Sequence, residues 1–373
     1  MKSPAAIIEQ RPCSNGKLMG YICLNSPGTL NALSLPMIKA LTKSLQQWRQ
    51  DPEVSFIWLE GSGDRAFCAG GDILQLYQSM CEHGQGPNPY AEQFFTQEYR
   101  LDYLIHRYPK PIICWGHGVV MGGGLGLMTG ASHRLVTEQS RMAMPEVTIG
   151  LFPDVGATWF LNRMGQGIGL FLGLTGATCN ATDALEIGWA DFFLPSSQKP
   201  ALLEALMRLP WTSGETNHTR VTQLLRSWQE QHQAQLPPGQ IAEHRDLIHQ
   251  VTQGRSLQEV AESILALPSR DHWFSKSQEG LAAACPMSLH ILWRQIRDGG
   301  TLSLTAVFQQ ELILAIQSTR AGDFQEGIRA LLVDKDRQPK WRFGAISAVP
   351  ESAIASMFAS PWEKHPLQDL TAH

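Results

Sequence analysis

Apolar and polar residues follow two different periods along the first part of the chain, and each period predicts a kind of element. Short runs rich in β-branched and aromatic residues at 5–9, 18–24 and 54–59 predict strands, because such residues fit a pleated, half-buried surface. Between them, residues 35–48 carry apolar side chains at intervals of three and four, which predicts a helix with one buried face.

The same alternation continues to about residue 144. A helix is predicted over 90–108, where it stops before Pro109, and strands are predicted over 112–115, 133–137 and 142–144. Strands that alternate with helices are typical of an α/β fold with much parallel pairing, and they do not fit a β-sandwich or a helix bundle.

After Pro195 the pattern becomes almost wholly helical, with breaks only at prolines and glycines. A chain of 373 residues is long enough for two domains, or for one large domain with an appendage. We therefore expect a core over residues 1–200 and a mainly helical extension over 201–373 that packs on that core.

Composition and charge exclude several classes of protein. Hydrophobic residues make up 43% of the chain and the net charge is only −4, so neither a disordered chain nor a nucleic-acid partner is expected. The most apolar run, 119–131, is shorter than the ~20 residues that span a bilayer, and the N-terminus lacks a secretory pattern. Seven scattered cysteines without Cys-x-x-Cys spacing are typical of a reducing compartment. We expect a cytoplasmic protein without a membrane partner.

Several common active-site motifs are absent from the sequence. It has no Gly-x-Ser-x-Gly elbow, no P-loop and no His-Glu-x-x-His pair. Gly165-Gln-Gly167 fits a helix boundary better than a nucleotide loop, and His244 and His249 do not share a helix face. The sequence therefore predicts no metal site.

Two glycine-rich turns each lead from a predicted strand into a predicted helix. The first runs from Ala69 to Asp72, which fits an N-cap, and the second is Gly122-Gly123-Gly124. Glycine lets the backbone approach a ligand, and a helix N-terminus presents unpaired N–H groups. Two such turns facing one another could direct two donors at one oxygen, as an oxyanion hole requires. Glycines that merely permit tight packing would give the same pattern, and Cys68 beside the first turn fits a small buried hydrophobe.

Two carboxylates, Glu146 and Asp154, lie in the otherwise apolar stretch of residues 142–160. Burial would raise the pKa of either carboxyl and make it a usable base near neutral pH. A surface glutamate and a turn aspartate would fit the pattern as well.

Three runs, in this order, resemble the crotonase (enoyl-CoA hydratase/isomerase) superfamily: residues 67–73, 117–124 and 144–156. Residues 324–341 resemble the C-terminal signature of one branch of it, so the resemblance covers nearly the whole chain. It implies an α/β fold, a crotonase-like spiral of ββα units with a helical C-terminal region. It also implies an acyl-CoA substrate. The implied reaction needs no cofactor, because coenzyme A is part of the substrate, and the resemblance allows a homo-oligomer.

The resemblance assigns roles to five positions. The backbone N–H groups of Gly71 and Gly123 would form the oxyanion hole for the thioester oxygen. Glu146 matches the catalytic glutamate, and Asp154 matches the aspartate that accompanies it in the hydrolases. Glu98 matches a further glutamate near the acyl pocket, although its helix alone has an ordinary amphipathic pattern. Glu98, Gly123, Glu146 and Asp154 are therefore the expected substrate-binding residues.

One departure separates the branches of the superfamily. The resemblance implies that a hydratase uses a second glutamate two residues after the triple-glycine turn, where this chain has Gly126. Because one of the two acid–base residues is missing, hydration of a double bond is chemically unfavourable here. Glu146 and the oxyanion hole suffice for thioester hydrolysis. Glu146 either attacks the carbonyl to give an anhydride or activates water, and the sequence leaves both routes open.

The resemblance is closest to the members that hydrolyse 3-hydroxyisobutyryl-CoA, so we expect a thioesterase acting on that compound or a similar short 3-hydroxyacyl-CoA, in valine breakdown. Two alternatives remain at this stage. One is an enoyl-CoA hydratase or isomerase, and the other is a non-catalytic crotonase-fold subunit of a larger assembly.

Overall fold

The structure, a computed structural model, describes residues 4–212, 214, 216–268 and 271–370. By its internal contacts the chain divides into two compact units, each assembled from three segments. The first unit consists of Met1–Gly71, Leu101–Met142 and Cys179–Ala242, and the second of Asp72–Arg100, Ala143–Thr178 and Glu243–His373. The expected boundary near residue 200 falls inside the third segment of the first unit.

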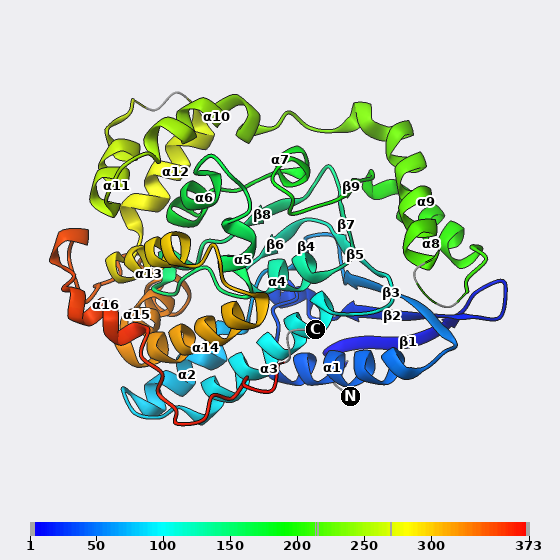
Figure 1. The fold of residues 1–373 in the computed structure, drawn as a ribbon, viewed down its shortest axis with the longest axis horizontal. Helices are drawn as coiled ribbons and strands as arrows, with labels where there is room; N and C mark the ends of the chain where they lie inside the picture. The colour runs from blue at the N-terminus through cyan, green and yellow to red at the C-terminus, as the bar shows by residue number, and fades with distance from the viewer. Residues whose placement is uncertain (1–3, 213, 215, 269–270, 371–373) are drawn as a thin grey trace. The chain divides into compact units, whose positions relative to one another are not determined.

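A six-stranded sheet with the order β1-β2-β3-β5-β7-β9 is the frame of the first unit (Figure 1). β1 and β2 pair antiparallel, and every later pair of neighbours is parallel. A second sheet has the order β4-β6-β8. The strands are β1 (Ala6–Pro12), β2 (Leu18–Leu24), β3 (Val54–Gly61), β4 (Ala66–Cys68), β5 (Ile112–Gly116), β6 (Val119–Met121), β7 (His133–Val136), β8 (Arg141–Ala143) and β9 (Phe192–Phe193).

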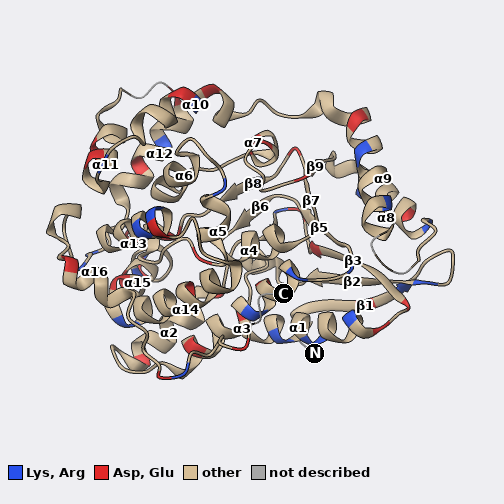
Figure 2. Cartoon of the chain, in the orientation of Figure 1, with Lys and Arg blue, Asp and Glu red and all other residues tan. Residues whose placement is uncertain are grey.

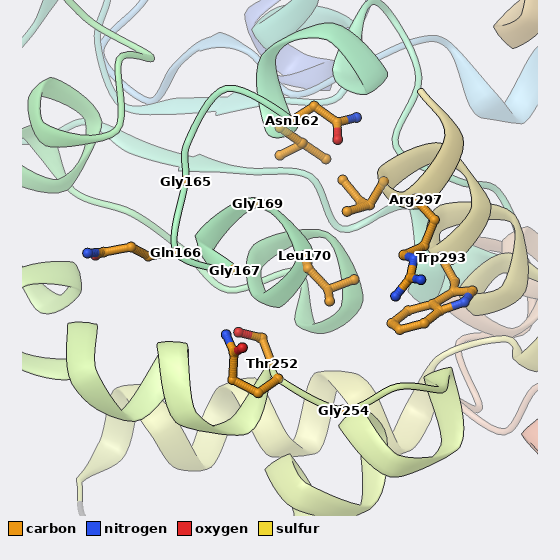
Figure 3. A pocket seen from close by; sticks show the side chains of 13 residues that line it. Asn162, Gly165, Gln166, Gly167, Gly169, Leu170, Thr252, Gly254, Trp293 and Arg297 are labelled. Atoms are coloured by element: carbon orange, nitrogen blue, oxygen red, sulfur yellow. The ribbon is translucent and has the colours of Figure 1, made fainter. Parts of the chain in front are cut away.

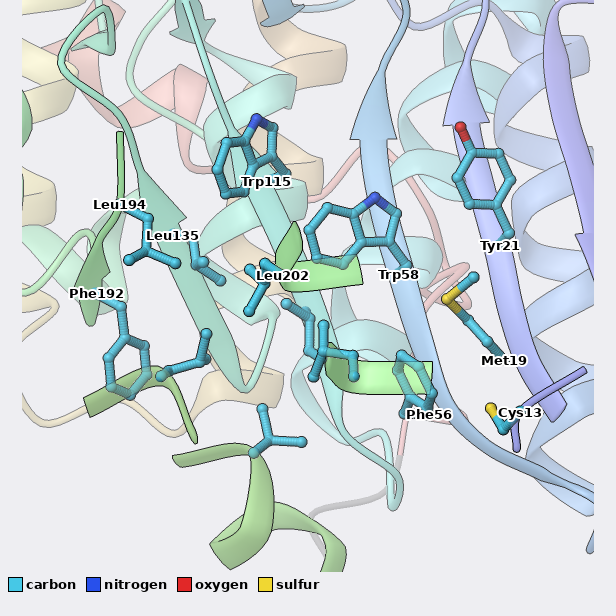
Figure 4. Packing of buried hydrophobic residues seen from close by; sticks show 14 of the residues in the cluster. Cys13, Met19, Tyr21, Phe56, Trp58, Trp115, Leu135, Phe192, Leu194 and Leu202 are labelled. Carbon is cyan, nitrogen blue, oxygen red and sulfur yellow. The ribbon is translucent and has the colours of Figure 1, made fainter. Parts of the chain in front are cut away.

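One face of the six-stranded sheet forms a hydrophobic core with α8 (Lys199–Met207) and α9 (Thr216–His232). Phe56 and Trp58, two residues apart on β3 and therefore on one face, lie in this core (Figure 4). Phe56 stacks on Trp211, with ring centroids 4.1 Å apart. The first helices of the predicted extension thus cover a face of the sheet, which explains why they belong to the first unit.

Local sequence sets where the helices of the first unit begin. Ser34 caps α1 (Leu35–Gln50), because its side chain accepts a hydrogen bond from the N–H of Met37. α4 (Gly123–Gly130) begins instead at Gly122, which has no side chain to cap it. This unit also contains α7 (Ala181–Glu186).

The predicted alternation of strands and helices is confirmed. The strands expected at 18–24, 54–59, 112–115 and 133–137 are β2, β3, β5 and β7, with ends that agree within two residues. The helix expected over 35–48 is α1, which is two residues longer. The sheet pairs mainly parallel, so the predicted α/β class is also confirmed.

The second unit is built mainly from helices, and it includes residues 89–100 of α3 (Pro89–His106) and most of α10 (Gln240–Val251). After β9 every element in the described part of the chain is helical, which confirms the helical pattern predicted from residue 201 onward. The other α-helices of this unit are α2 (Ile73–His83), α5 (Ala157–Leu161), α6 (Ile168–Thr175), α11 (Leu257–Ala266), α12 (His272–Ala283), α13 (Pro286–Asp298), α14 (Leu304–Ala321), α15 (Asp323–Ile328) and α16 (Glu351–Met357), and the unit also contains the short 3₁₀-helix η2 (Glu146–Ile149).

Charged residues are scattered over many elements of both units rather than gathered on one of them (Figure 2). Within the described ranges, no helix is at once long enough and apolar enough to cross a bilayer. Cys68 is buried beside the first glycine turn, as expected of a small hydrophobe, whereas Cys81 is exposed.

Candidate active site

The two glycine-rich turns follow neighbouring strands of the first unit. The first turn, Ala69 to Gly71, comes directly after β4, and the second, Gly122 to Gly124, joins β6 to α4. β4 and β6 pair parallel, so the carboxyl ends of both strands lie at one edge of their sheet. The two turns therefore leave the sheet side by side.

Glycine is required where these turns meet. A β carbon on Gly124 would lie 2.2 Å from the carbonyl oxygen of Cys68, closer than real contacts allow. Gly70 has a φ of +113°, and a β carbon there would lie 4.0 Å from the nitrogen of Gly123. The N–H groups of a first helical turn have no partner inside their helix, and Gly123 opens α4. The expected oxyanion donors, Gly71 and Gly123, thus belong to two turns in contact, and their role stays a prediction.

The three expected carboxylates, Glu98, Glu146 and Asp154, all lie in the second unit, and all are buried, with exposures of 2%, 5% and 4%. Burial, and then repulsion from Asp154, raises the pKa of Glu98 and of Glu146 well above the usual range. The structure therefore brings these three side chains into one electrostatic cluster, and their burial excludes the surface interpretation of Glu146.

Asp154 has a specific hydrogen-bond donor. The Tyr99 hydroxyl on α3 donates to Oδ2 of Asp154 at 2.6 Å. Burial raises the pKa of Asp154 to about 7, while the hydrogen bond from Tyr99 lowers it. A carboxyl that titrates near neutral pH can accept or release a proton during turnover.

Glu146 opens η2, and one of its oxygens is open to a further interaction. Oε2 is buried and has no hydrogen-bond partner among the described residues. A buried acceptor without a donor costs about 1–3 kcal/mol, so native proteins rarely leave one unless something else binds there. This oxygen of Glu146 therefore has hydrogen-bonding capacity that no described residue uses.

The sequence alone did not point to a fourth buried carboxylate, Glu311 on α14. Its Oε2 accepts a hydrogen bond from the N–H of Gly156 at 2.7 Å, and its Oε1 accepts one from the N–H of Thr158 at 2.9 Å. Burial raises the pKa of Glu311 to about 8 although both N–H donors lower it. Glu311 is the one acidic residue of α14, and this was the only available signal.

A separate cavity of about 270 Å³ lies in the second unit beside the start of α6 (Figure 3). Gly167 is the N-cap of α6 with a φ of +77°, which confirms the helix boundary predicted at Gly165-Gln-Gly167. The side chains of Trp293 and Arg297 on α13 also line the cavity, whereas none of the four carboxylates does. The cavity is therefore distinct from the carboxylate cluster.

Comparison with known proteins decides the family. The profile of the enoyl-CoA hydratase/isomerase family matches residues 19–358. This chain belongs to that family. Two curated proteins that are similar to this chain, one from Danio rerio and one from Gallus gallus, are both named mitochondrial 3-hydroxyisobutyryl-CoA hydrolases. The first is 38% identical over 91% of this chain and 87% of its own length, and the second is 36% identical over 91% and 86%.

A solved enoyl-CoA hydratase from Rhodobacter sphaeroides has the same fold as this family member. The two chains superpose with a TM-score of 0.81 at 32% identity, over 95% of this chain and 97% of the other. The crotonase resemblance, and with it the crotonase-type α/β fold with a helical C-terminal region, is confirmed.

Proposed function

We propose that this member of the enoyl-CoA hydratase/isomerase family is a thioesterase that hydrolyses 3-hydroxyisobutyryl-CoA or a similar short 3-hydroxyacyl-CoA. Water adds to the acyl group and the carbon–sulfur bond breaks, so the products are the free acid and coenzyme A. The reaction needs no cofactor beyond the coenzyme A of the substrate. The names of the curated relatives support this proposal, and they agree with a role in valine breakdown.

The observation that carries the proposal is the contrast between Glu146 and Gly126. Glu146 is a buried carboxylate with one unpartnered oxygen among the described residues, whereas Gly126, where the resemblance expects the second glutamate of a hydratase, has no side chain. Hydration needs a base and an acid at two carbons. Hydrolysis of a thioester needs one base or nucleophile and donors for the oxyanion, so it is the reaction that this set of residues serves.

In the proposed reaction the N–H groups of Gly71 and Gly123 bind the oxygen of the thioester as it gains negative charge. Glu146 either attacks the carbonyl carbon and expels the thiolate, leaving an anhydride that water opens, or takes a proton from the water that attacks. Its raised pKa suits a proton acceptor. Glu98 and Asp154 bind the acyl group.

A pair of assays on the purified chain tests the proposal. We expect 3-hydroxyisobutyryl-CoA to release free thiol, and crotonyl-CoA to keep its conjugated absorbance. Loss of that absorbance without thiol release from either compound would overturn the proposal in favour of a hydratase.

The hydratase is the second candidate function, because the solved relative from Rhodobacter sphaeroides carries that name. A non-catalytic role in a larger assembly is the third. Turnover of neither compound, together with co-purification in a large complex, would favour that role.

We also propose a cytoplasmic location and no nucleic-acid or membrane partner, and the family resemblance allows a homo-oligomer. The curated relatives are named mitochondrial, so the compartment of this chain needs its own test. Cell fractionation followed by size-exclusion chromatography with light scattering measures both the location and the subunit number.

A further inference from the structure

The turn that carries Asp154 holds a valine in a backbone conformation that this residue does not favour. Val155 has a φ of +53° and Gly156 a φ of +91°. A β-branched residue at positive φ is a genuine outlier, and such conformations persist only where the surroundings fix them. Contacts from outside the turn must therefore hold residues 153–158 in place.

Glu311 supplies the first of these contacts. Helix α5 begins directly after the turn, and its N-cap, Gly156, has no side chain to cap it. The Glu311 carboxylate accepts hydrogen bonds from the N–H groups of Gly156 and Thr158, at 2.7 and 2.9 Å. Glu311 lies 155 residues after Gly156 in the sequence. The cap of α5 thus comes from α14, and two oxygens of one buried carboxylate fix the end of the turn.

Gln295 on α13 holds the same turn at its beginning. Its Nε2 donates to the carbonyl oxygen of Pro153 at 3.0 Å and to Oγ1 of Thr158 at 2.8 Å. A carbonyl oxygen can only accept, so the amide nitrogen must face Pro153. Residues 153–158 are therefore held at both ends by side chains of the helical C-terminal region.

Tyr99 fixes the side chain that this turn presents. Its hydroxyl donates to Oδ2 of Asp154 at 2.6 Å. Its ring is fully buried and lies against Phe95 and Phe308, with both centroid distances 5.9 Å. Packing against these two rings fixes the position of the hydroxyl oxygen, so its hydrogen bond favours one orientation of the Asp154 carboxylate.

We propose that Tyr99 and Glu311 are positioning residues that act through Asp154: Tyr99 orients its carboxylate, and Glu311 fixes the backbone that carries it. This inference rests on the proposed hydrolysis of a 3-hydroxyacyl-CoA, in which Asp154 binds the acyl group. The two residues lie far from Asp154 in the sequence, on α3 and α14, and together they make one orientation of this side chain the stable one.

The charges around Asp154 give the proposal a pH signature. Among the described residues, those whose pKa values respond to the charge of Asp154 are Glu98 and Tyr99 from α3, Glu146 from η2 and Glu311 from α14, and all four are acids. The Tyr99 hydroxyl donates to the carboxylate and so favours its ionised form. Removing that hydroxyl should therefore move the pH at which Asp154 ionises upward.

The experiment compares Tyr99→Phe and Glu311→Gln with two matched controls from the first unit. Tyr108→Phe removes a buried hydroxyl that donates to the carbonyl of Leu45, and Glu60→Gln removes a buried carboxylate that is paired with Lys199. For each variant, kcat and KM are measured between pH 5 and pH 9 on 3-hydroxyisobutyryl-CoA and on isobutyryl-CoA.

We expect Tyr99→Phe to lower kcat about tenfold, the rate equivalent of one hydrogen bond to a charged group, and to move the acidic limb of the pH profile to higher pH. Glu311→Gln should lower kcat about tenfold or more while KM changes little. Both changes should shrink the preference for the hydroxylated substrate. Tyr108→Phe and Glu60→Gln should leave the profile and the preference unchanged.

An unchanged pH profile and an unchanged preference in folded Tyr99→Phe and Glu311→Gln would overturn the inference and leave the proposed function intact. Absence of thiol release by the unmutated chain would instead overturn the proposed function. If Glu311→Gln does not fold, Tyr99→Phe decides alone, because its ring keeps the contacts with Phe95 and Phe308.

Discussion

The start of α4 lies so close to the end of β4 that a β carbon on Gly124 would stand 2.2 Å from the carbonyl oxygen of Cys68. This approach joins the two glycine turns of the first unit and fixes the position of Gly123 relative to the turn that ends at Gly71. The proposed oxyanion donors therefore depend on a contact in which only glycine fits.

Gly124→Ala should lower both activity and stability. We expect a loss of about 1–3 kcal/mol in the free energy of unfolding from overpacking. Because the turns must separate, the donor on Gly123 shifts, and a shift of about 1 Å can cost about 10²-fold in kcat. Thermal unfolding and thiol release on 3-hydroxyisobutyryl-CoA measure the two effects.

Gly28→Ala is the matched control, since a β carbon on Gly28 meets no atom within 4 Å. Normal turnover and normal stability of Gly124→Ala would contradict the prediction. They would show that the backbone at Cys68 shifts to make room for the β carbon without loss of activity or stability. The two turns would then be independent of one another.

Glu146→Gln keeps the size of the side chain and removes its ability to act as a base or a nucleophile. Turnover should fall by at least about 10²-fold, the low end for a positioned acid–base group, while KM changes little. Steady-state thiol release measures both constants. Activity within a few-fold of the unmutated chain would make the assignment wrong, and Glu98, the neighbouring buried glutamate, would be tested next.

The elements that the sequence predicts well are those whose own residues specify them. α1 has a regular apolar spacing and a serine cap, and β3 is a continuous apolar run bounded by turn residues. β6 and β9 were not predicted. They have three and two residues and depend on pairing with their neighbours, so their own residues give little signal, although β8, also three residues long, was predicted at 142–144.

The same limit applies to the site. Family resemblance pointed to Glu146 and Asp154 through the continuous motif of residues 144–156, and to Glu98 by its place along the chain. Their roles stay predictions. Glu311 and Tyr99 escaped notice, because the first caps a helix 155 residues earlier and the second meets Asp154 across 55 residues. Contacts of that range leave no local pattern, and only the packed structure shows them.

The raised pKa of Asp154 predicts how its replacement changes stability with pH. An aspartate ionises near pH 3.9 when unfolded, whereas burial raises the pKa of Asp154 to about 7 in the folded chain. Between these values the folded chain binds more protons, so the stability that Asp154 contributes is lost as pH rises. Asp154→Asn should therefore become more stable than the unmutated chain, by up to about 1.4 kcal/mol for each pH unit in this window.

Chemical unfolding at several values between pH 5 and pH 7 measures this difference. Asp369→Asn is the control of opposite sign, because a hydrogen bond from Arg100 lowers the pKa of Asp369. It should leave stability unchanged or lower it slightly at neutral pH. A difference between Asp154→Asn and the unmutated chain that does not grow with pH would contradict the prediction.

The last prediction concerns Asp154 and the hydroxyl of the substrate. A buried carboxylate is costly without partners, and Tyr99 donates to only one of its oxygens. The 3-hydroxyl of the acyl group, or the attacking water, is the further partner that the proposed reaction supplies. A site built to bind a hydroxyl rejects an analogue that lacks it, because its own polar group is then left without a partner.

We therefore expect isobutyryl-CoA to be hydrolysed about 10²-fold more slowly than 3-hydroxyisobutyryl-CoA, and Asp154→Ala to remove most of that preference. Asp323→Ala is the matched control, because Asp323 lies in the same unit and both aspartates are 4% exposed. It should leave the ratio of the two kcat/KM values unchanged. Equal rates on the two substrates with the unmutated chain would contradict the prediction, because a carboxylate that binds the 3-hydroxyl should favour the compound that carries it. Asp154 would then only stabilise its turn or position water.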